Sequence, residues 1–494
     1  MKTILMKNLM NKWNKSLSLT ALSLVIILPL FTQSTHAESA KEEKAVANEN
    51  KNTKVHENVL DNGLKVLVKQ DKRAPIAVIQ VWYRVGTSYE HEGITGLSHA
   101  LEHMMFKGTK KRKSGEFEKI LSANGARNNA FTSQDYTAYY EVLAKDKLEV
   151  AMEIEADRMR NLVFDPEEFK KEIEVVKEER RWRTDDKPAS LTREQFNATA
   201  FLNSPYRAPV IGWMVDLEGM KLEDAYDWYK KWYTPNNATL VVVGDVEPDN
   251  VLAMAKKYFD VHKPNDLPEV KARTEVKQLG KRNVVVKLPA KLASLRMGFK
   301  TPGMISAKNQ DDKNKVEKWE PYALEVLANI LDGGASARFS KNLIRGKEIA
   351  ASAGAGYYGF GRLPNMLVMS GIPAKGISTS ALEKALLEEI EALKTELVSE
   401  AELERVKAQV VAGEVYERDS IEHIATILGS LESVGLGHKL MDEFVPEIMA
   451  ITAEQIQAVA KKYLVEDQLT VAELIPQPMN NDANNSNNKK GKVN

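Results

Sequence analysis

The apolar and polar positions of the chain form two similar sets of segments. In the first set, apolar and alternating runs predict strands at Leu64–Lys69 and Ile76–Val85, a strand pair within Asn129–Leu143, and a strand at Ala238–Gly244. The second set predicts strands at Arg282–Leu288, Ser294–Lys300 and Gln468–Leu474. Segments with a helical period lie between the strands, so each set is expected to combine a sheet with helices.

Both sets also end in the same way. A helix ending at Trp228–Tyr233 precedes the turn Thr234–Asn237 and a strand, and a helix ending at Ala460–Leu464 precedes a short turn and a strand. This repetition indicates an internal duplication. The 494 residues also exceed the ~250–300 at which a single core stops growing. We therefore expect one half at 55–262, a linker rich in Pro, Lys and Glu at 263–280, and a second half at 281–478.

The two ends of the chain have a different character. Residues 1–37 combine early lysines, an apolar run from Leu17 to Phe31 and the small-residue end Thr35-His36-Ala37, which is the pattern of a secretory signal peptide. The run is shorter than the roughly 20 residues of a spanning helix, although an uncleaved anchor is an alternative. Residues 38–54 read as a disordered spacer and 479–494 as a disordered tail. An exported protein, periplasmic or secreted, is expected.

Charge and cysteine content narrow the possible partners. The leader carries four lysines and no acidic residue, so the chain without it has a net charge of −4. No basic stripe is present, and nucleic acid is therefore not an expected partner. The chain has no cysteine, so an exported protein of this sequence must fold without disulfides.

The segment Gly96–Gly108 carries the strongest chemical signal. On a helix, His99 and His103 are four residues apart and project from one face, which suits two nitrogen ligands of one Zn²⁺. Glu102 lies beside them and could accept a proton from a water that the metal activates, without being a ligand. The order H-x-x-E-H is the inverzincin signature. The alternative is a helix with two solvated histidines, which the neighbouring apolar residues disfavour: Leu97, Leu101, Met104 and Met105.

Two histidines leave a catalytic zinc site incomplete, because such sites normally have three protein ligands. An acidic helix is the better source of the third. Asp165-Pro166 begins this helix as an N-cap followed by proline. Glu172 and Glu179 then share one face with Val176, whereas Glu174 and Glu178 point elsewhere.

These motifs resemble the pitrilysin/insulinase family of zinc peptidases, in particular its short branch that includes mitochondrial processing peptidase. The resemblance rests on H-x-x-E-H and on Val-Val-x-Glu-Glu, which ends 76 residues after His103. It implies an α+β fold of two homologous halves, each a mostly antiparallel sheet covered by helices. It also implies that Glu179 is the third ligand of one zinc ion and that Glu172 supports the ligands from outside. The strand Asn129-Ala130-Phe131-Thr132 resembles the edge strand on which the family holds the substrate backbone.

The second half departs from the family pattern at one position. Arg345 matches an arginine that helps to hold the substrate carbonyl, but Ala351 or Ser352 stands where a tyrosine is expected. A missing oxyanion donor typically costs about 2.7–4 kcal/mol in the transition state. Either a homologous partner subunit supplies the arginine–tyrosine pair, or Tyr357 or Tyr358 substitutes and the chain works as a monomer or homodimer.

The sequence thus predicts an exported zinc endopeptidase that cuts peptides or unfolded protein segments. Glu102 would act as general base and then protonate the leaving amine. The first half would be catalytic. The second half lacks H-x-x-E-H, so it would be a homologous domain that encloses the substrate without binding a metal. The alternatives are a non-proteolytic assembly subunit of the same family and a peptide-binding chaperone.

Overall fold

The computed structural model describes residues 54–308 and 315–479. The expected signal peptide, nearly all of the spacer and nearly all of the tail lie outside these residues. Within the described ranges, no helix combines the length and the apolar character that crossing a membrane requires.

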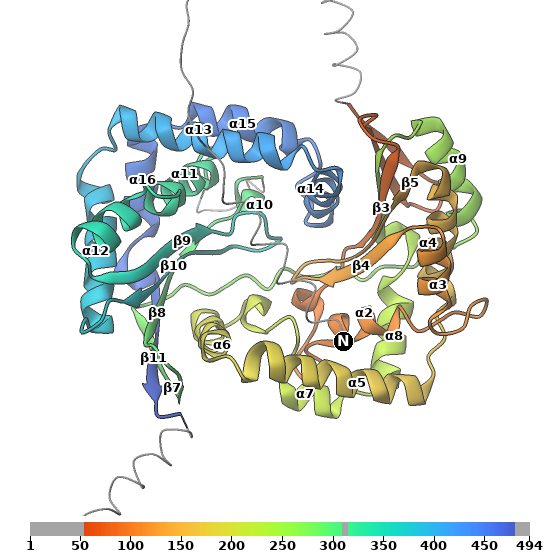
Figure 1. The fold of residues 1–494 in the computed structure, drawn as a ribbon, viewed down its shortest axis with the longest axis horizontal. Helices are drawn as coiled ribbons and strands as arrows, with labels where there is room; N and C mark the ends of the chain where they lie inside the picture. Colours follow the sequence, from red (N-terminus) through yellow and green to blue (C-terminus); the bar gives the residue numbers. More distant parts are fainter. Residues whose placement is uncertain (1–53, 309–314, 480–494) are drawn as a thin grey trace, which may run out of the picture. The chain divides into compact units, whose positions relative to one another are not determined.

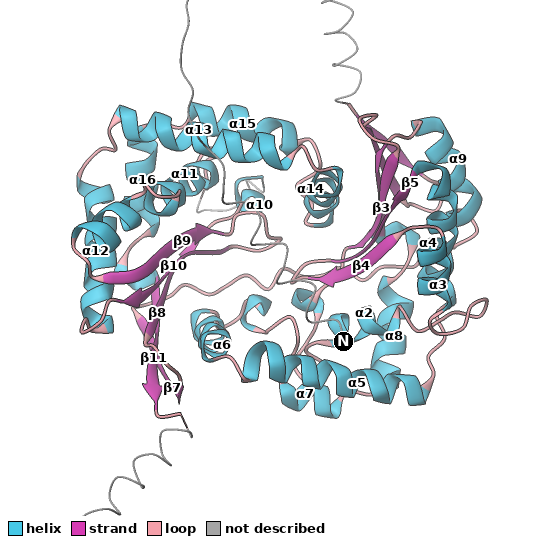
Figure 2. Cartoon of the chain, in the orientation of Figure 1, coloured by secondary structure: helices cyan, strands magenta, loops and turns pink. Residues whose placement is uncertain are grey.

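The first half contains one six-stranded sheet, in the order β1-β2-β6-β3-β5-β4. Figures 1 and 2 show β3, β4 and β5 of this sheet. Its strands are β1 Val55–Val59, β2 Lys65–Gln70, β3 Ile76–Tyr83, β4 Arg127–Thr132, β5 Thr137–Ala144 and β6 Ala238–Gly244. Its α-helices are α2 Leu97–Met104, α3 Glu116–Ala123, α4 Leu148–Asn161, α5 Pro166–Arg180, α6 Pro188–Ala200, α7 Met214–Gly219, α8 Leu222–Trp232 and α9 Pro248–Phe259. Short helical turns are η1 Thr87–Tyr89, η2 Lys145–Lys147, η3 Arg181–Asp185, η4 Pro205–Arg207 and η5 Pro235–Asn237.

The second half contains a five-stranded sheet, in the order β7-β11-β8-β10-β9. Its strands are β7 Arg282–Pro289, β8 Ser294–Thr301, β9 Ala350–Tyr357, β10 Asn365–Pro373 and β11 Leu469–Gln477. Its helices are α10 Met304–Lys308, α11 Glu320–Asp332, η6 Phe339–Gly346, α12 Thr379–Thr395, α13 Glu400–Glu417, α14 Ile421–Ser433, α15 Leu440–Ala450, α16 Ala453–Tyr463 and η7 Glu466–Gln468.

The predicted fold class is confirmed. In both sheets one pair of strands is parallel, β2 with β6 and β7 with β11, and the other pairs are antiparallel. Except for β1, each strand of the first sheet has a counterpart at the same place in the second. The repeated closing unit is α8–η5–β6 in one half and α16–η7–β11 in the other.

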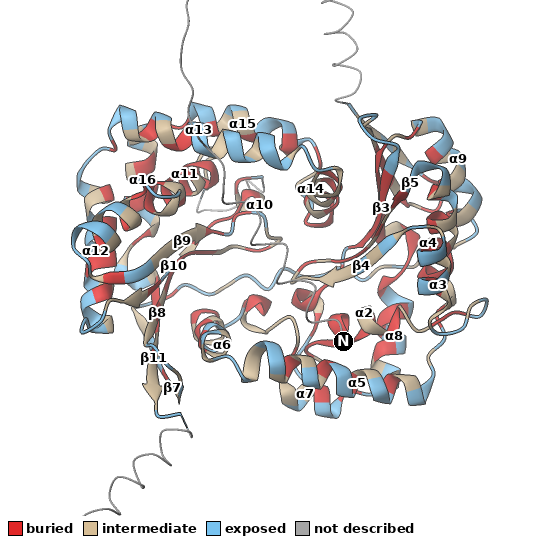
Figure 3. Ribbon diagram, viewed as in Figure 1, coloured by how far each residue is buried: buried red, intermediate tan, exposed pale blue. Residues whose placement is uncertain are grey.

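Burial explains why the central strands read as continuous apolar runs. β3 is buried from Ala77 to Tyr83 and β6 along its whole length, since helices cover both faces of the sheet (Figure 3). By contrast, β1 alternates partly buried and exposed residues at the edge of its sheet. The sequence analysis missed β1 because its polar residues give no apolar run.

Each half covers a face of the other half's sheet with one helix. α14 packs against β3 and β6 (Figure 1), and its Ile424, Ala425 and Leu428 join a buried cluster with Trp82. At Gly429 the helix approaches so closely that an added Cβ would lie 2.1 Å from the Trp82 indole nitrogen. In return, α6 packs against β7, β11 and β8.

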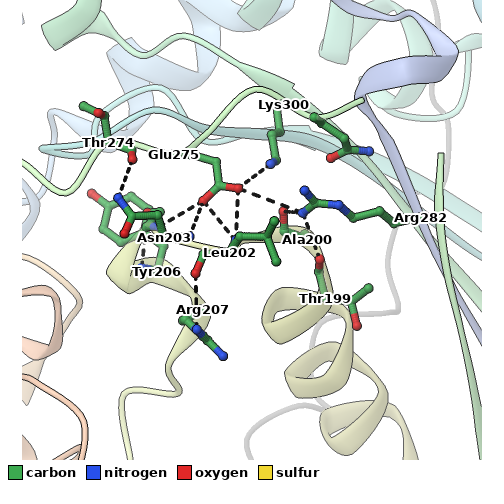
Figure 4. A network of polar contacts seen from close by, with 12 residues as sticks. Thr199, Ala200, Leu202, Asn203, Tyr206, Arg207, Thr274, Glu275, Arg282 and Lys300 are labelled. Carbon is green, nitrogen blue, oxygen red and sulfur yellow. Dashed lines mark hydrogen bonds and ion pairs between the residues drawn. The ribbon is translucent and has the colours of Figure 1, made fainter. Parts of the chain in front are cut away.

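The segment between the halves is tied to both of them. Residues 263–280 contain no helix or strand. Within this segment the Glu275 carboxylate accepts hydrogen bonds from the backbone N–H groups of Leu202, Asn203 and Ser204 and from Lys300 Nζ at 2.6 Å (Figure 4). One buried carboxylate therefore joins the loop after α6 to β8.

Candidate metal centre

The N-terminus of α2 is held by a buried carboxylate. Glu90 accepts hydrogen bonds from the backbone N–H groups of Gly96 at 2.8 Å and Ser98 at 2.7 Å. Gly96 has φ of 86°, and its Cα lies against Gly212, so a side chain at either glycine would collide with the other segment's backbone. These contacts fix the start of the helix that carries His99 and His103.

The structure brings His99, His103 and Glu179 together, with one ligand atom of each within 4.8 Å of the others. Glu179 Oε2 lies 3.6 Å from His99 Nε2 and 3.3 Å from His103 Nε2. Glu179 is the penultimate residue of α5, which packs against α2. The side chain of His99 is only 10% exposed and that of Glu179 15%. These two side chains are thus largely buried.

Glu172 contacts His103 at the ring nitrogen Nδ1, on the side of the ring opposite the candidate ligand atom Nε2. Its Oε2 lies 3.3 Å from His103 Nδ1, and its Oε1 lies 2.5 Å from Lys107 Nζ. A carboxylate on Nδ1 fixes the ring orientation and leaves Nε2 free to bind a metal. Glu179 Oε1 is similarly held by Arg183 at 2.8 Å.

Glu102 lies beside the three residues and makes a different contact. Its Oε2 accepts a 2.5 Å hydrogen bond from the Thr132 hydroxyl at the end of β4. Burial raises the pKa of Glu102 above its ordinary value, against the opposing effects of the Thr132 hydrogen bond and His103.

The donor set fits zinc. Two imidazole nitrogens and one carboxylate oxygen, with room for a further ligand, form the usual catalytic arrangement. Burial, together with the nearby His103, lowers the pKa of His99 to about 4, so His99 is neutral and able to bind a metal near neutral pH. Burial also lowers the pKa of His103, but the hydrogen bonds to Glu179 and Glu172 and the negative charges of Glu179 and Glu102 together outweigh this effect, and the net shift is upward.

A cavity of about 950 Å³ opens beside these residues. Its walls include His99, Glu102, His103 and Glu179, the strand segment Asn129–Thr132, and the η3 residues Trp182 and Arg183. β4 is at the edge of the first sheet, so the outer backbone groups of this strand are free to pair with another strand. Asn129, Ala130, Phe131 and Thr132 therefore lie beside the centre, as expected.

Two other residues lie outside the metal-binding group. Glu178 borders this cavity, but its side chain is 70% exposed and pairs with Arg181. Arg345 is not among the residues that line this cavity. It is exposed on η6, donates to the Ala335 carbonyl and borders a separate cavity with Arg338 and Glu389. Within this chain, then, Arg345 lies at a different cavity from the metal centre.

The two candidate tyrosines differ. Tyr357 is buried, and its hydroxyl donates a hydrogen bond to the Pro302 carbonyl at 2.6 Å. This hydroxyl is therefore used within the second half. Tyr358 is 55% exposed. Ser352, at the position of the expected tyrosine, lies in β9, pairs with Ile372 of β10 and is exposed.

Sequence reasoning missed three supporting residues. Lys107 and Arg183 each lie four residues after a residue of the centre, His103 and Glu179, and this helical spacing could have indicated them. Glu90 gives no local signal, because it reaches the helix from outside the motif.

Comparison with known proteins agrees with this geometry. Residues 65–212 match the family model described as Insulinase (Peptidase family M16), and residues 219–410 match the Peptidase M16 inactive domain. The zinc protease PqqE of Helicobacter pylori is 30% identical over 426 residues, which cover 85% of this chain and 93% of that protein.

Solved structures show the same fold. A protease from Helicobacter pylori superposes with a TM-score of 0.79 at 29% identity, covering 86% of this chain and all of that chain. The periplasmic protease PqqL from Escherichia coli has a TM-score of 0.71 at 18% identity, and the match covers 88% of this chain but 50% of that chain. The protein therefore belongs to the M16 insulinase family of peptidases, in agreement with the resemblance seen in its sequence.

Proposed function

We propose that the protein is a zinc-dependent endopeptidase that hydrolyses peptides or unfolded segments. His99, His103 and Glu179 would hold one zinc ion, and Glu102 would act as the general base. The observation that carries the proposal is the convergence of these three ligand atoms beside a carboxylate that is not part of their group. Homologues that are named zinc proteases support the choice of metal.

When bound, zinc would activate a water and polarise the substrate carbonyl. Glu102 would take the proton of the attacking water and deliver it to the leaving amine. Thr132 holds one Glu102 oxygen, which keeps the other directed to the cavity.

The substrate would add as a strand to β4. The free edge of β4 supplies main-chain hydrogen bonds that are independent of substrate sequence. The exposed side chains of Trp182 and Val175 line the same cavity and would contact an apolar substrate side chain. A flexible chain can adopt the extended form that this edge requires, whereas a folded protein cannot.

Location and assembly also belong to the proposal. The leader pattern of residues 1–37 supports export, and one fold neighbour is named a periplasmic protease. Because neither Arg345 nor Tyr357 lies at the cavity, a homologous partner subunit or a second copy that supplies an arginine–tyrosine pair is part of the proposal.

Metal analysis combined with peptide cleavage tests the proposal. The purified protein should contain about one zinc per chain, lose cleavage of an unstructured peptide after chelation, and recover it on adding zinc. Stoichiometric zinc without cleavage of any unstructured peptide, with or without a co-purifying partner, would favour the assembly subunit. Peptide binding that persists in chelator without cleavage would favour the chaperone.

A further inference from the structure

A second cavity of about 540 Å³ adjoins the cavity of the metal centre. Five residues line both: Thr132, Gln134, Arg193, Asn197 and Val210. The second cavity is bordered by α6 and the turn after β4 in the first half, and by Arg296 and Tyr358 in the second half. A peptide lying along β4 and passing Thr132 would therefore enter it.

Three charged side chains line this second cavity: Asp135, Arg193 and Arg296. The Asp135 carboxylate is satisfied within the protein. It accepts hydrogen bonds from Ser88 Oγ at 2.7 Å, from Tyr206 and from the Arg362 backbone N–H at 2.9 Å, and it lies 3.7 Å from Arg362 Nε. Its charge is therefore balanced by Arg362, which leaves the two other arginines as the uncompensated charges of the cavity.

Phe196 places these two arginines next to each other. Its ring is buried against β8, where a Cβ on Gly298 would come within 2.7 Å of Phe196 Cζ. Arg296 is two residues before Gly298 on the same face of β8, and its guanidinium lies 5.3 Å from the Phe196 ring centroid. Arg193 is three residues before Phe196, on the same side of α6.

Neither arginine forms an ion pair with any carboxylate of the described residues 54–308 and 315–479. Arg296 Nε is also buried without a hydrogen-bond partner. Burial lowers the pKa of Arg296 and the nearby positive charge of Arg193 adds to this lowering, while the charge of Tyr358 and its hydrogen bond with Arg296 partly oppose it. A buried donor without a partner costs free energy, and an anionic ligand would recover that cost.

We propose that Arg193 and Arg296 form a carboxylate-binding subsite that selects peptides with an acidic group at one position away from the cleaved bond. The guanidinium fork matches a carboxylate in two parallel hydrogen bonds. The exposed Tyr358 lines the same cavity and could add a hydroxyl donor. The carboxylate could be an Asp or Glu side chain or a free C-terminus. This inference rests on the proposed peptidase function.

The test is cleavage of matched peptides by the zinc-loaded full-length protein. One series moves a single Glu or its Gln control along the peptide, and a second compares a free with an amidated C-terminus. Wild type should show kcat/KM about ten-fold or more higher for the acidic group at one position, since a charged hydrogen bond typically gives that discrimination. The series that shows the preference identifies the source of the carboxylate.

Variants show whether these arginines cause the preference. Arg193→Gln and Arg296→Gln should each reduce the ratio of kcat/KM for Glu over Gln peptides toward one, and Arg193→Glu should favour Lys in place of Glu. Arg405→Gln is the matched control, since Arg405 is a partly exposed arginine on α13 that contacts Gln409 and lines neither of these two cavities. It should keep the wild-type ratio.

Two results would overturn the subsite: no acidic preference in wild type, or a preference that Arg193→Gln and Arg296→Gln both retain. Peptide binding is measured in parallel to separate this proposal from the proposed function. Tighter binding of Glu than Gln peptides that depends on Arg193, without any cleavage, would support the subsite and contradict the peptidase activity.

Discussion

Helices α2 and α11 occupy corresponding places in the two halves, since each packs behind its sheet after the strands β3 and β8. α2 places His99, Glu102 and His103 at the centre. α11 buries Leu324, Leu327, Ala328 and Leu331 instead. Its polar residues Glu325 and Asn329 have the same four-residue spacing as the histidines, but the Asn329 amide donates to Glu325 at 3.1 Å.

This difference shows that the fold alone does not create the metal centre. Both halves supply an edge strand and a helix behind it, yet in the described residues the single group suited to a metal lies in the first half. A few side chains on α2 and α5 set the chemistry, whereas the equivalent positions of the second half serve packing.

Removing a residue of the ligand group should abolish metal binding. We expect His103→Ala and Glu179→Gln to lose stoichiometric zinc and all cleavage, because two ligands cannot hold catalytic zinc firmly. Glu178→Gln is the matched control: its side chain is 70% exposed, so zinc content should stay at the wild-type level. Metal analysis after dialysis measures both. A Glu179→Gln protein that keeps zinc while Glu178→Gln loses it would reverse the assignment.

Glu172→Gln should have a smaller effect on the same centre. Glu172 contacts His103 Nδ1 rather than the ligand side, so we expect zinc affinity to fall by about 10–100-fold without abolishing binding. Competition with a metal-binding dye gives the affinity. Glu325→Gln on α11 should leave zinc affinity unchanged, since it is on the helix without a metal group; a change there would contradict the division between the halves.

The packing of one half on the other can be tested at Gly429. Gly429→Ala would place a Cβ against the Trp82 indole and should lower stability by about 1–3 kcal/mol. Gly413→Ala on α13 is the control, because no atom lies within 4 Å of its added Cβ and helix propensity should stabilise it by up to about 1 kcal/mol. Thermal unfolding compares the two. Equal stability would mean that α14 is not closely packed on β3.

The smallest expected effect concerns the ion pair between β2 and α14. Lys65 Nζ lies 2.7 Å from Glu432 Oε2, and His438 also donates to Glu432. Burial raises the pKa of Glu432, but the hydrogen bonds from Lys65 and His438 outweigh it, so the net pKa lies below the ordinary 4.5. The pair therefore stabilises the fold above pH 4.5 and loses this contribution as the pH falls through the lowered pKa.

Accordingly, Glu432→Gln should lower stability by about 1 kcal/mol at pH 6, and the difference from wild type should narrow on acidification. Unfolding curves at pH 6 and at lower pH measure this difference. A stability difference between the two proteins that widens as the pH falls would show that the ionised Glu432 carboxylate does not stabilise the fold.

The sequence was sufficient for the features that depend on local patterns. The buried strands β3 and β6 read as apolar runs, and His99, Glu102 and His103 share a helical face, so both were predictable. The Asp165 N-cap of α5 also follows from a local pattern. Its side chain accepts hydrogen bonds from the backbone N–H groups of Glu167 and Glu168.

Features that depend on contacts between distant segments could not be predicted. Gly429 against Trp82 joins residues far apart in the chain, and nothing local marks either for close approach. Likewise, the contact of Thr132 with Glu102 requires β4 to lie beside α2. Arg345 matched a family position by sequence, yet it borders a separate cavity and donates to the Ala335 carbonyl, and no spacing rule indicates this placement.

The most direct test of the central claim is the Glu102→Gln variant, measured for zinc content and peptide cleavage in the same preparation. The variant keeps His99, His103 and Glu179 and removes only the proposed base. We expect about one zinc per chain, as in wild type, with cleavage reduced by at least ~100-fold, because general-base catalysis typically contributes 10²–10⁴-fold. Cleavage at the wild-type rate with zinc bound would contradict the account.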